Sequence, residues 1–178
     1  MSEAAGRSWL LTAPARLHFG LLALGDVAAE AQHRGAGTMT CQPAVTLAIR
    51  PAEGEAASEP RWLHVVGPRA ERIRAFAARW WEARNRMSIA PCRIEVLQTP
   101  PEHAGFGSGT ALALSVARLL AAWCGEAEPG PAELAAATGR ARRSSIGTWG
   151  FARGGLLVEP GKPVGDTLAP LSFRCNLP

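Results

Sequence analysis

Residues 101–110 restrict the possible folds of this chain more than any other segment. They read Pro-Glu-His-Ala-Gly-Phe-Gly-Ser-Gly-Thr, with glycine at three alternate positions, and run into an apolar stretch that ends at about Cys124. Glycine reaches positive φ angles and lets backbone N–H groups approach a ligand closely. A helix that begins at Ser108 or Thr110 would point its unpaired N–H groups and the positive end of its dipole at the same place. The segment therefore predicts a turn and a buried helix that cradle an anion, with phosphate as the first candidate.

Two familiar phosphate-binding loops do not fit this spacing. A Walker loop needs lysine before its Ser or Thr, and the chain has a single lysine, Lys162, far from the turn. The dinucleotide fingerprint Gly-x-Gly-x-x-Gly fails because Thr110 stands in the place of the third glycine. The simpler interpretation is a turn that only starts a helix, with Ser108 as its N-cap. An isolated glycine cluster favours that simpler interpretation.

Hydrophobic periodicity and turn residues divide the rest of the chain into strands and helices. Strands are predicted over residues 8–13, 17–24, 44–50, 61–66, 92–97 and 154–159. Helices are predicted over residues 68–85, 108–124 and 131–138. Residues 51–60 and 160–170 are predicted loops, and residues 171–178 resemble the start of another strand. Because strands and helices interleave irregularly, the pattern favours an α+β fold over a doubly wound sheet.

Composition and charge narrow the ligand class. The 178 residues are 47% apolar and 19% charged, which suits one domain with a buried core. The formal net charge is +4, and every basic residue except Lys162 is arginine. Arginine binds planar oxyanions in a bidentate manner, so phosphate or carboxylate ligands are favoured. A net charge this small over this length is a weak signal for nucleic acid, which is not expected as a partner.

Cysteine usage and the apolar segments predict a compartment. The four cysteines are far apart and form no Cys-x-x-Cys pair, so buried reduced thiols are favoured over a zinc site or a disulfide scaffold. The N-terminus shows no basic segment followed by an apolar one. The most apolar stretch, residues 111–124, is too short to span a membrane and contains Arg118. The sequence therefore predicts a cytoplasmic protein with no membrane partner.

The loop does not stand alone, because other segments carry a resemblance with it. The loop and the Ala-Leu-Ala-Leu that follows resemble the phosphate loop of the GHMP kinase superfamily. Residues 15–21, 34–37 and 139–147 look more specifically like the β-ribofuranosylaminobenzene 5′-phosphate synthase branch, and the last continues into 151–155. The resemblance implies an α+β domain of the ribosomal protein S5 domain 2-like type, the N-terminal GHMP domain, over residues 1–178. It also implies that the C-terminal GHMP domain is absent and that the last residues are the start of it.

One departure from the kinases of this superfamily bears on the reaction. Many of them carry Ser-Gly-x-Asp, with the aspartate as catalytic base. The similar stretch here reads Ser144-Ser145-Ile146-Gly147, with glycine in the place of the acid. Without that carboxylate, an acceptor alcohol has no candidate base at this position. The departure favours the synthase branch over the kinases.

The resemblance implies phosphoribosyl transfer in methanopterin biosynthesis. The similar synthase condenses phosphoribosyl pyrophosphate with 4-aminobenzoate (or 4-hydroxybenzoate), releases carbon dioxide and pyrophosphate, and yields β-ribofuranosylaminobenzene 5′-phosphate. This chemistry needs donors and cations for a phosphate, a departing pyrophosphate and a benzoate carboxylate, rather than a covalent nucleophile. The implied partners are thus a small phosphorylated substrate and an aromatic acid.

The candidate site residues are phosphate-binding, cationic or able to transfer protons. One phosphate group would be held by Gly105, Gly107, Ser108, Gly109 and Thr110. The other charged end would be clamped by Arg142 and Arg143 beside Ser144 and Ser145, with Arg16, His18 and Arg34 lining the same cleft. His103 is the candidate for proton transfer or phosphate binding, against a purely structural role. Its place in an apolar strand favours a satisfied core or edge histidine for His18 over a catalyst. A solvated helix face, rather than a nucleic-acid patch, is predicted for Arg69, Arg72 and Arg79.

Two alternatives remain open beside the synthase. The phosphate loop alone is compatible with an ATP-dependent small-molecule kinase, in which ATP is the substrate. The third interpretation is a truncated domain that folds but lacks a complete site. No metal ligands and no resident cofactor are predicted, although Mg²⁺ is compatible with a pyrophosphate substrate, and a homodimer is compatible with the sequence.

Overall fold

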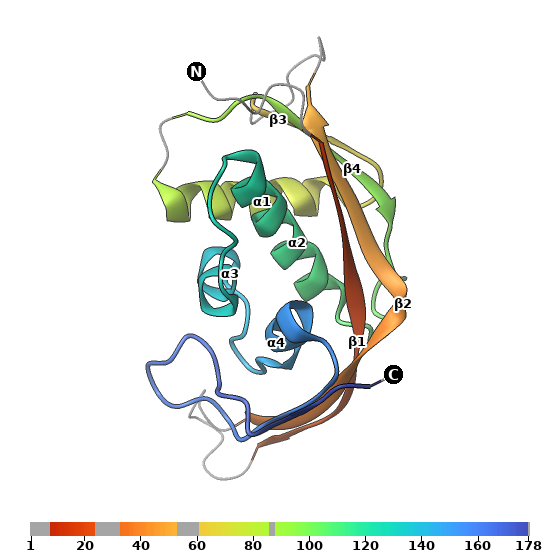
Figure 1. Cartoon of the computed structure of the whole chain (residues 1–178), viewed down its shortest axis with the longest axis vertical. Helices are drawn as coiled ribbons and strands as arrows, with labels where there is room; N and C mark the ends of the chain where they lie inside the picture. Colours follow the sequence, from red (N-terminus) through yellow and green to blue (C-terminus); the bar gives the residue numbers. More distant parts are fainter. Residues whose placement is uncertain (1–7, 24–32, 53–60, 86–87, 178) are drawn as a thin grey trace.

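The computed structural model describes residues 8–23, 33–52, 61–85 and 88–177. Within these ranges the chain forms six strands and four helices (Figure 1). In chain order they are β1 (Trp9–Ala23), β2 (His33–Pro51), β3 (Leu63–Val66), α1 (Ala70–Arg84), β4 (Cys92–Gln98), α2 (Ser108–Trp123), α3 (Pro131–Thr138), α4 (Ile146–Arg153), β5 (Leu156–Glu159) and β6 (Phe173–Cys175). The α+β class is confirmed.

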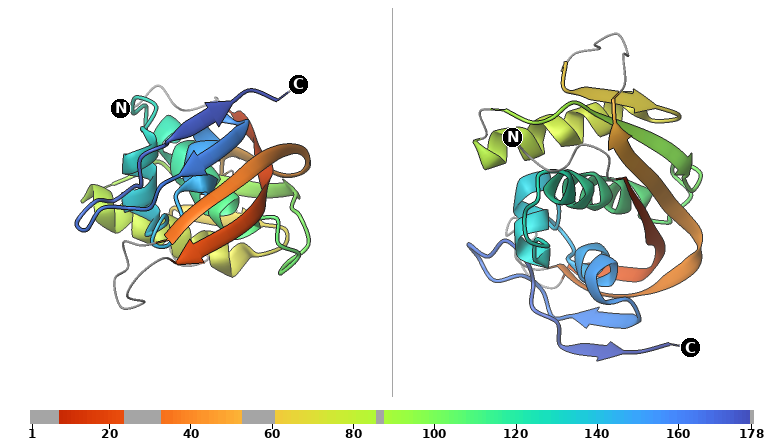
Figure 2. Two further views of the ribbon diagram at one scale, coloured as in Figure 1. Left: turned by 90° about the horizontal axis from the view of Figure 1, so that it is seen from below. Right: turned by 45° about the horizontal axis from the view of Figure 1, so that its top comes forward.

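The strands form one mixed sheet organised around the long strand β2. β1 runs antiparallel to β2 along nearly its whole length. β4 and β5 are both antiparallel to β2 and pair with opposite ends of its other edge. β3 lies parallel to β4, and β6 lies antiparallel to β5. The sheet curves around α2 and the other helices, which lie on its concave side (Figure 2).

The core lies between this concave side and α2. Alternation along β2 places Val45, Leu47 and Ile49 inward, and all three are fully buried, as the period of two predicts. α2 is buried on nearly every side and packs against α1, α3, α4 and the sheet, which confirms its predicted place at the centre of the domain. In the described ranges, no helix is long and apolar enough to cross a bilayer.

Several boundaries differ from the sequence prediction. The strands predicted at 8–13 and 17–24 are one strand, β1, that continues through Pro14. Pro14 pairs with Ala44 and the next residue, Ala15, pairs with Thr40, so a bulge in β2 absorbs the irregularity. β2 also begins eleven residues before the predicted start at Ala44, because pairing with β1 and β5 outweighs the weak strand propensity of its glycines.

The helices differ from the prediction at two places. α1 begins at Ala70 rather than Pro68, because Arg69 adopts a left-handed conformation with φ 63° and is the N-cap rather than a helical residue. α4 is absent from the prediction, since Gly147 and Gly150 weaken its helical propensity. These glycines allow close packing, because a Cβ on Gly150 would overlap the side chain of Met39.

Smaller differences concern the segments read as loops and the chain end. β3 begins two residues after the predicted start of the 61–66 strand, and Pro51 belongs to β2 rather than to the 51–60 loop. Residues 53–60 and Leu24 lie outside the described residues. The strand predicted near the chain end is present as β6.

Candidate functional site

The glycine-rich turn leads into α2 as predicted and encloses a cavity of about 260 Å³. Gly105 and Gly107 have φ angles of 79° and 63°, which an L side chain rarely adopts. Gly107 is the N-cap of α2, so Ser108 is the first helical residue rather than the cap. The first N–H groups of a helix have no partner within it, and no acidic residue stands in the first turn of α2. The turn therefore offers donors and a positive dipole end to an anion.

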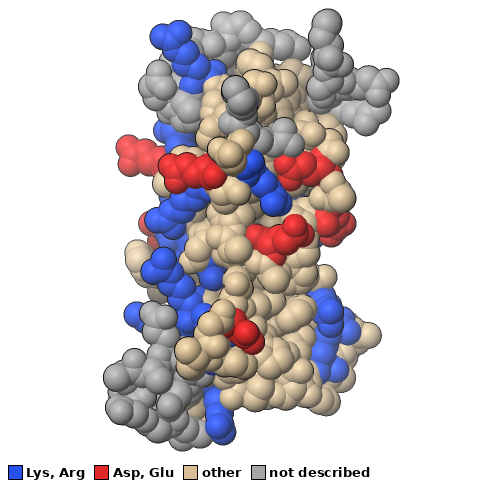
Figure 3. Space-filling view, turned by 90° about the vertical axis from the view of Figure 1, so that its left-hand side faces the viewer, with Lys and Arg blue, Asp and Glu red and all other residues tan. Residues whose placement is uncertain are grey.

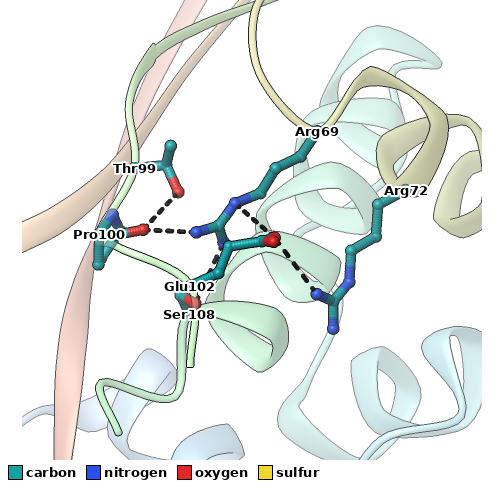
Figure 4. A network of polar contacts seen from close by, with 6 residues as sticks. All are labelled: Arg69, Arg72, Thr99, Pro100, Glu102 and Ser108. Carbon is teal, nitrogen blue, oxygen red and sulfur yellow. Dashed lines mark hydrogen bonds and ion pairs between the residues drawn. The ribbon is translucent and has the colours of Figure 1, made fainter. Parts of the chain in front are cut away.

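Arg69 holds this turn in place from the start of α1 (Figure 4). Its Nε lies 3.1 Å from Glu102 Oε1, and its Nη1 donates to Ser108 Oγ at 3.1 Å. Its third guanidinium nitrogen, Nη2, donates to the carbonyl oxygen of Pro100. The side chain of Arg69 is only 7% exposed, so the prediction that it belongs to a solvated helix face is wrong. The turn is thus fixed by a buried cation before any ligand binds.

Arg72 and Arg140 complete the walls of this cavity. Arg72 Nη1 also lies 3.8 Å from Glu102 Oε1, but the side chain of Arg72 is 44% exposed, as predicted for a solvated helix face. A Cβ on Gly109 would lie 2.7 Å from Arg72 Nη2 and 3.8 Å from Arg140 Nη2, so both guanidinium groups sit directly over the start of α2. Burial, together with the charges of Arg72 and Arg79, lowers the pKa of Arg140. The cavity concentrates positive charge that a bound anion would neutralise.

A second cavity of about 510 Å³ adjoins the first, and Thr110 and Arg140 line both. The other polar side chains around it are those of Arg16, His18, Arg142, Arg143 and Ser144. The structure thus brings together most of the residues predicted to bind the other charged end of a substrate. Basic side chains also form a band down one side of the face shown in Figure 3. The two cavities together make one site with two cationic ends.

Two predicted residues, Arg34 and Ser145, occupy other positions, whereas His103 lies where it was predicted. Arg34 lines a separate cavity with Phe19 and Val158, so the prediction that it shares a cleft with Arg16 is wrong. The alternation of side chains along β2 places it on a different side of the sheet. Ser145 is buried beneath the site, where its Oγ accepts a hydrogen bond from the N–H of Ala169 at 2.7 Å. His103 does line the glycine-loop cavity, in a left-handed conformation with φ 58°.

A buried carboxylate, Glu159, lines the separate cavity with Arg34 and was not predicted from the sequence. It is 1% exposed, and its Oε2 accepts the N–H of Ser145 at 2.6 Å. Burial raises its pKa, while hydrogen bonds from Ser144 and Ser145 and the charges of Arg16 and His33 act in the opposite direction. Burial likewise lowers the pKa of Arg16, and the charge of Glu159 partly offsets this. The available signal was the strand period, since Leu157 and Glu159 share the buried side of β5.

Gly147 faces the same site. A Cβ at this position would lie 3.2 Å from Arg16 Nη1 and 3.2 Å from Thr110 Cγ2. Any side chain here would project between those two residues and would require them to shift. Gly147 therefore lies beside Arg16 and Thr110, two residues that line the joined cavities.

The described ranges contain no preassembled set of metal ligands. No group of three or more His, Cys, Asp or Glu side chains in these ranges could hold a metal ion. Glu102 lines the first cavity, and Arg69 and Arg72 already pair with it.

Comparison with known proteins agrees with this geometry. Residues 72–151, which include the loop, α2 and most of α4, match the family model described as GHMP kinases N terminal domain. A curated relative, the beta-ribofuranosylphenol 5′-phosphate synthase of Methanocaldococcus jannaschii, is 36% identical over 81 residues. These residues are 46% of this chain and 24% of that protein. The predicted resemblance to the GHMP kinase superfamily is thereby confirmed.

Solved structures support the fold over most of the chain. A 4-(cytidine 5′-diphospho)-2C-methyl-D-erythritol kinase is 23% identical with a TM-score of 0.57, over 88% of this chain and 55% of the other. The mevalonate kinase of Methanococcus jannaschii is 11% identical with a TM-score of 0.61, over 86% and 53%. The mevalonate kinase of Staphylococcus aureus is 15% identical with a TM-score of 0.59, over 96% and 57%. The chain thus spans about half the length of these kinases and has the fold of a GHMP N-terminal domain.

Proposed function

We propose that this chain carries out phosphoribosyl transfer: it joins phosphoribosyl pyrophosphate to an aromatic acid with loss of carbon dioxide. The acceptor is 4-hydroxybenzoate or 4-aminobenzoate, and the product is the corresponding β-ribofuranosyl 5′-phosphate. A C–C bond forms between ribose C1 and the ring, the C1–pyrophosphate bond breaks, and the ring loses its carboxylate as carbon dioxide. The name of the Methanocaldococcus jannaschii relative, a ribofuranosylphenol phosphate synthase, favours the hydroxylated acceptor.

The observation that carries this proposal is the position of Gly147. It lies beside Arg16 and Thr110, which line the joined cavities, and the resemblance to the kinases would place an aspartate that acts as base at this position. With glycine there, the site has cations for two anionic groups and no carboxylate at the kinase position. Departure of pyrophosphate requires electrostatic stabilisation of that kind rather than a nucleophile.

Each part of the site has a role in this scheme. The turn at Gly105–Gly107 and the start of α2 would hold one phosphate group through backbone N–H groups. Arg140 lies between the cavities and would contact the pyrophosphate as its charge develops. Arg142 and Arg143 are exposed at the mouth of the second cavity and would bind the acceptor carboxylate. His103 stays a candidate for phosphate binding at the first cavity.

The test supplies phosphoribosyl pyrophosphate and carboxyl-labelled 4-hydroxybenzoate or 4-aminobenzoate to the folded protein. We expect release of labelled carbon dioxide that requires both substrates and yields one pyrophosphate for each carbon dioxide. The double variant Arg142→Gln/Arg143→Gln should raise the KM for the acceptor. Arg84→Gln is the matched control, because Arg84 lies at the far end of α1 and pairs with Glu126. Absence of labelled carbon dioxide from folded protein would overturn the proposal.

A second candidate, an ATP-dependent small-molecule kinase, is favoured by one observation. The turn and α2 are shared in fold with solved kinases of the superfamily. A kinase predicts that ATP with Mg²⁺ raises the melting temperature more than phosphoribosyl pyrophosphate does. The transferase predicts the reverse order, so one thermal titration with both ligands separates the two candidates.

A further inference from the structure

One face of α1 gathers arginines beside the two cavities. Arg72, Phe76 and Arg79 stand at positions i, i+4 and i+7 of the helix, so they share one face. α1 packs against α3, and the segment that follows α3 brings Arg140 onto the same face. The guanidinium carbon of Arg140 lies 4.8 Å from the centre of the Phe76 ring, and that of Arg72 lies 5.9 Å from it. Three arginines from two segments thus meet on this face.

These three side chains form an arginine row, in the order Arg72, Arg140, Arg79. At its first end, Arg72 Nη2 and Arg140 Nη2 lie 2.7 Å and 3.8 Å from the position of a Cβ on Gly109, at the start of α2. At its other end, Arg79 Nη1 lies 3.8 Å from the position of a Cβ on Gly139, which lines the second cavity. Seven helical residues separate Arg72 from Arg79, a rise of about 10 Å. The arginine row therefore begins over the phosphate turn and reaches the edge of the second cavity.

Acidic side chains neutralise little of this charge. Neither Arg79 nor Arg140 has an ion pair within the described part of the chain. Glu102 is the one acid among the described residues that line the two cavities, and it is shared between Arg69 and Arg72. Burial, together with the charges of Arg72 and Arg79, lowers the pKa of Arg140. Like charges held together in this way repel one another in the free protein, and a bound anion would relieve that repulsion.

The length of the arginine row selects the kind of anion. A single phosphate on the N–H groups at the start of α2 would meet Arg72 and Arg140, because both guanidinium groups lie over that point. It would leave Arg79 without a partner, since Arg79 lies at the opposite end of the arginine row. A diphosphate carries a second phosphoryl group, which would lie beside Arg140 and within reach of Arg79. Each guanidinium can then bind phosphate oxygens in a bidentate manner.

We propose that Arg79 is a specificity residue: with Arg72 and Arg140 it binds a diphosphate group along α1 and makes the site prefer a diphosphate to a single phosphate. This deepens the proposed function and rests on it for the identity of the substrate. The pyrophosphate end of phosphoribosyl pyrophosphate then lies along the arginine row, and its 5′-phosphate lies in the second cavity. In the kinase candidate the same group would belong to ATP, and the thermal titration with both ligands separates these two sources.

The test compares the Kd of pyrophosphate with the Kd of inorganic phosphate by isothermal titration. Arg79→Gln should raise the pyrophosphate Kd about tenfold and change the phosphate Kd by less than about twofold, because only the contact to the second phosphoryl group is lost. Arg79→Lys keeps the charge without the bidentate geometry and should give an intermediate pyrophosphate Kd. The side chain of Arg79 is exposed, so these variants should fold. Arg84→Gln is the matched control on the same helix, because Arg84 Nε pairs with Glu126 Oε2 at 3.4 Å, and it should change neither Kd.

An unchanged pyrophosphate Kd in Arg79→Gln would overturn the role of Arg79, as would an equal loss of affinity for pyrophosphate and phosphate. In the transfer assay, Arg79→Gln should raise the KM for phosphoribosyl pyrophosphate and leave the KM for the aromatic acid unchanged. The binding result does not depend on turnover. Selective loss of pyrophosphate affinity in a protein without transfer activity would support the role of Arg79 and reject the proposed function. Transfer activity with an unchanged pyrophosphate Kd would reject only the role of Arg79.

Discussion

Replacing Arg140 by glutamine should weaken anion binding but leave the free energy of unfolding nearly unchanged. Arg140 lines both cavities, and the positive charge of neighbouring Arg72 repels it. Arg72 Nη2 and Arg140 Nη2 both approach the Cβ position of Gly109, at 2.7 Å and 3.8 Å, so they are no more than about 6.5 Å apart. Two positive charges at that distance repel by about 2.5 kcal/mol at an effective dielectric constant of 20 and by about 0.6 kcal/mol in water. Since the side chain of Arg72 is 44% exposed, solvent screens part of this repulsion, and we use a value of about 1 kcal/mol for it.

The stacking of Arg140 on Phe76 offsets this repulsion. The guanidinium carbon lies 4.8 Å from the ring centroid, which is worth about 1 kcal/mol. Arg140→Gln loses the stacking and relieves the repulsion, so the free energy of unfolding should change by less than about 1 kcal/mol. Bound pyrophosphate instead loses one charge-assisted contact of about 2 kcal/mol, which corresponds to a Kd about 30-fold higher.

Isothermal titration with pyrophosphate gives the affinity, and urea denaturation of the free protein gives the stability. Arg84→Gln is the control, because it removes an equal charge from the Arg84–Glu126 pair at the far end of α1. It should change the Kd by less than about threefold, as expected for a screened, distant charge. A pyrophosphate Kd for Arg140→Gln within threefold of wild type would refute the reasoning, as would a loss of stability above about 3 kcal/mol.

Four further predictions test the supports of the site. Arg69→Leu should cost about 2 kcal/mol and make residues 99–107 sensitive to protease, because three contacts to the turn are lost. Gly155→Ala should place a methyl group against the Cys175 carbonyl oxygen and increase hydrogen exchange selectively in β6, because Gly155 has φ 85°. Cys92 should resist thiol reagents at pH 8 in the folded state, since burial raises its pKa to about 12, whereas exposed Cys175 reacts. Because burial raises the pKa of Glu159 above 4.5, the stability of the wild type relative to Glu159→Gln should fall as pH rises from that value, which denaturation at stepped pH measures.

The central elements were predictable from the sequence because local and global signals agree there. The glycine turn, the all-round apolar run of α2 and the end of α3 at Gly139 each specify their structure within a few residues. Gly139 adopts φ 63° as a helix-ending glycine should. The turn and its helix lie in adjacent sequence, so the phosphate cradle was visible before the fold.

The rest of the site depends on contacts between distant segments. The two glycines of α4 allow the helix to approach Arg16 and Met39 closely. Local helix propensity gives no sign of these contacts. Arg69 and Arg72 look like an exposed helix face in sequence, and only the return of the loop beside α1 gives them partners. Glu159 is a lone acid in an apolar strand until the start of α4 supplies its donors. Such residues are found by asking which polar group occupies a buried position of a strand.

Backbone strain offers independent support for the site. Among the described residues, four non-glycine positions have positive φ: Arg69, Asn85, His103 and Ala141. Asn85 ends α1, where a left-handed residue is ordinary. Two of the other three line the joined cavities: His103 lies within the glycine-rich turn and Ala141 lies beside Arg140. The third, Arg69, anchors the turn through Glu102. Each such residue costs about 1 kcal/mol or more, and such strain persists where the surrounding structure over-determines it. These strained residues gather around the two cationic cavities rather than across the sheet. Such a distribution is expected where the backbone is held so that arginine side chains can contact an anion.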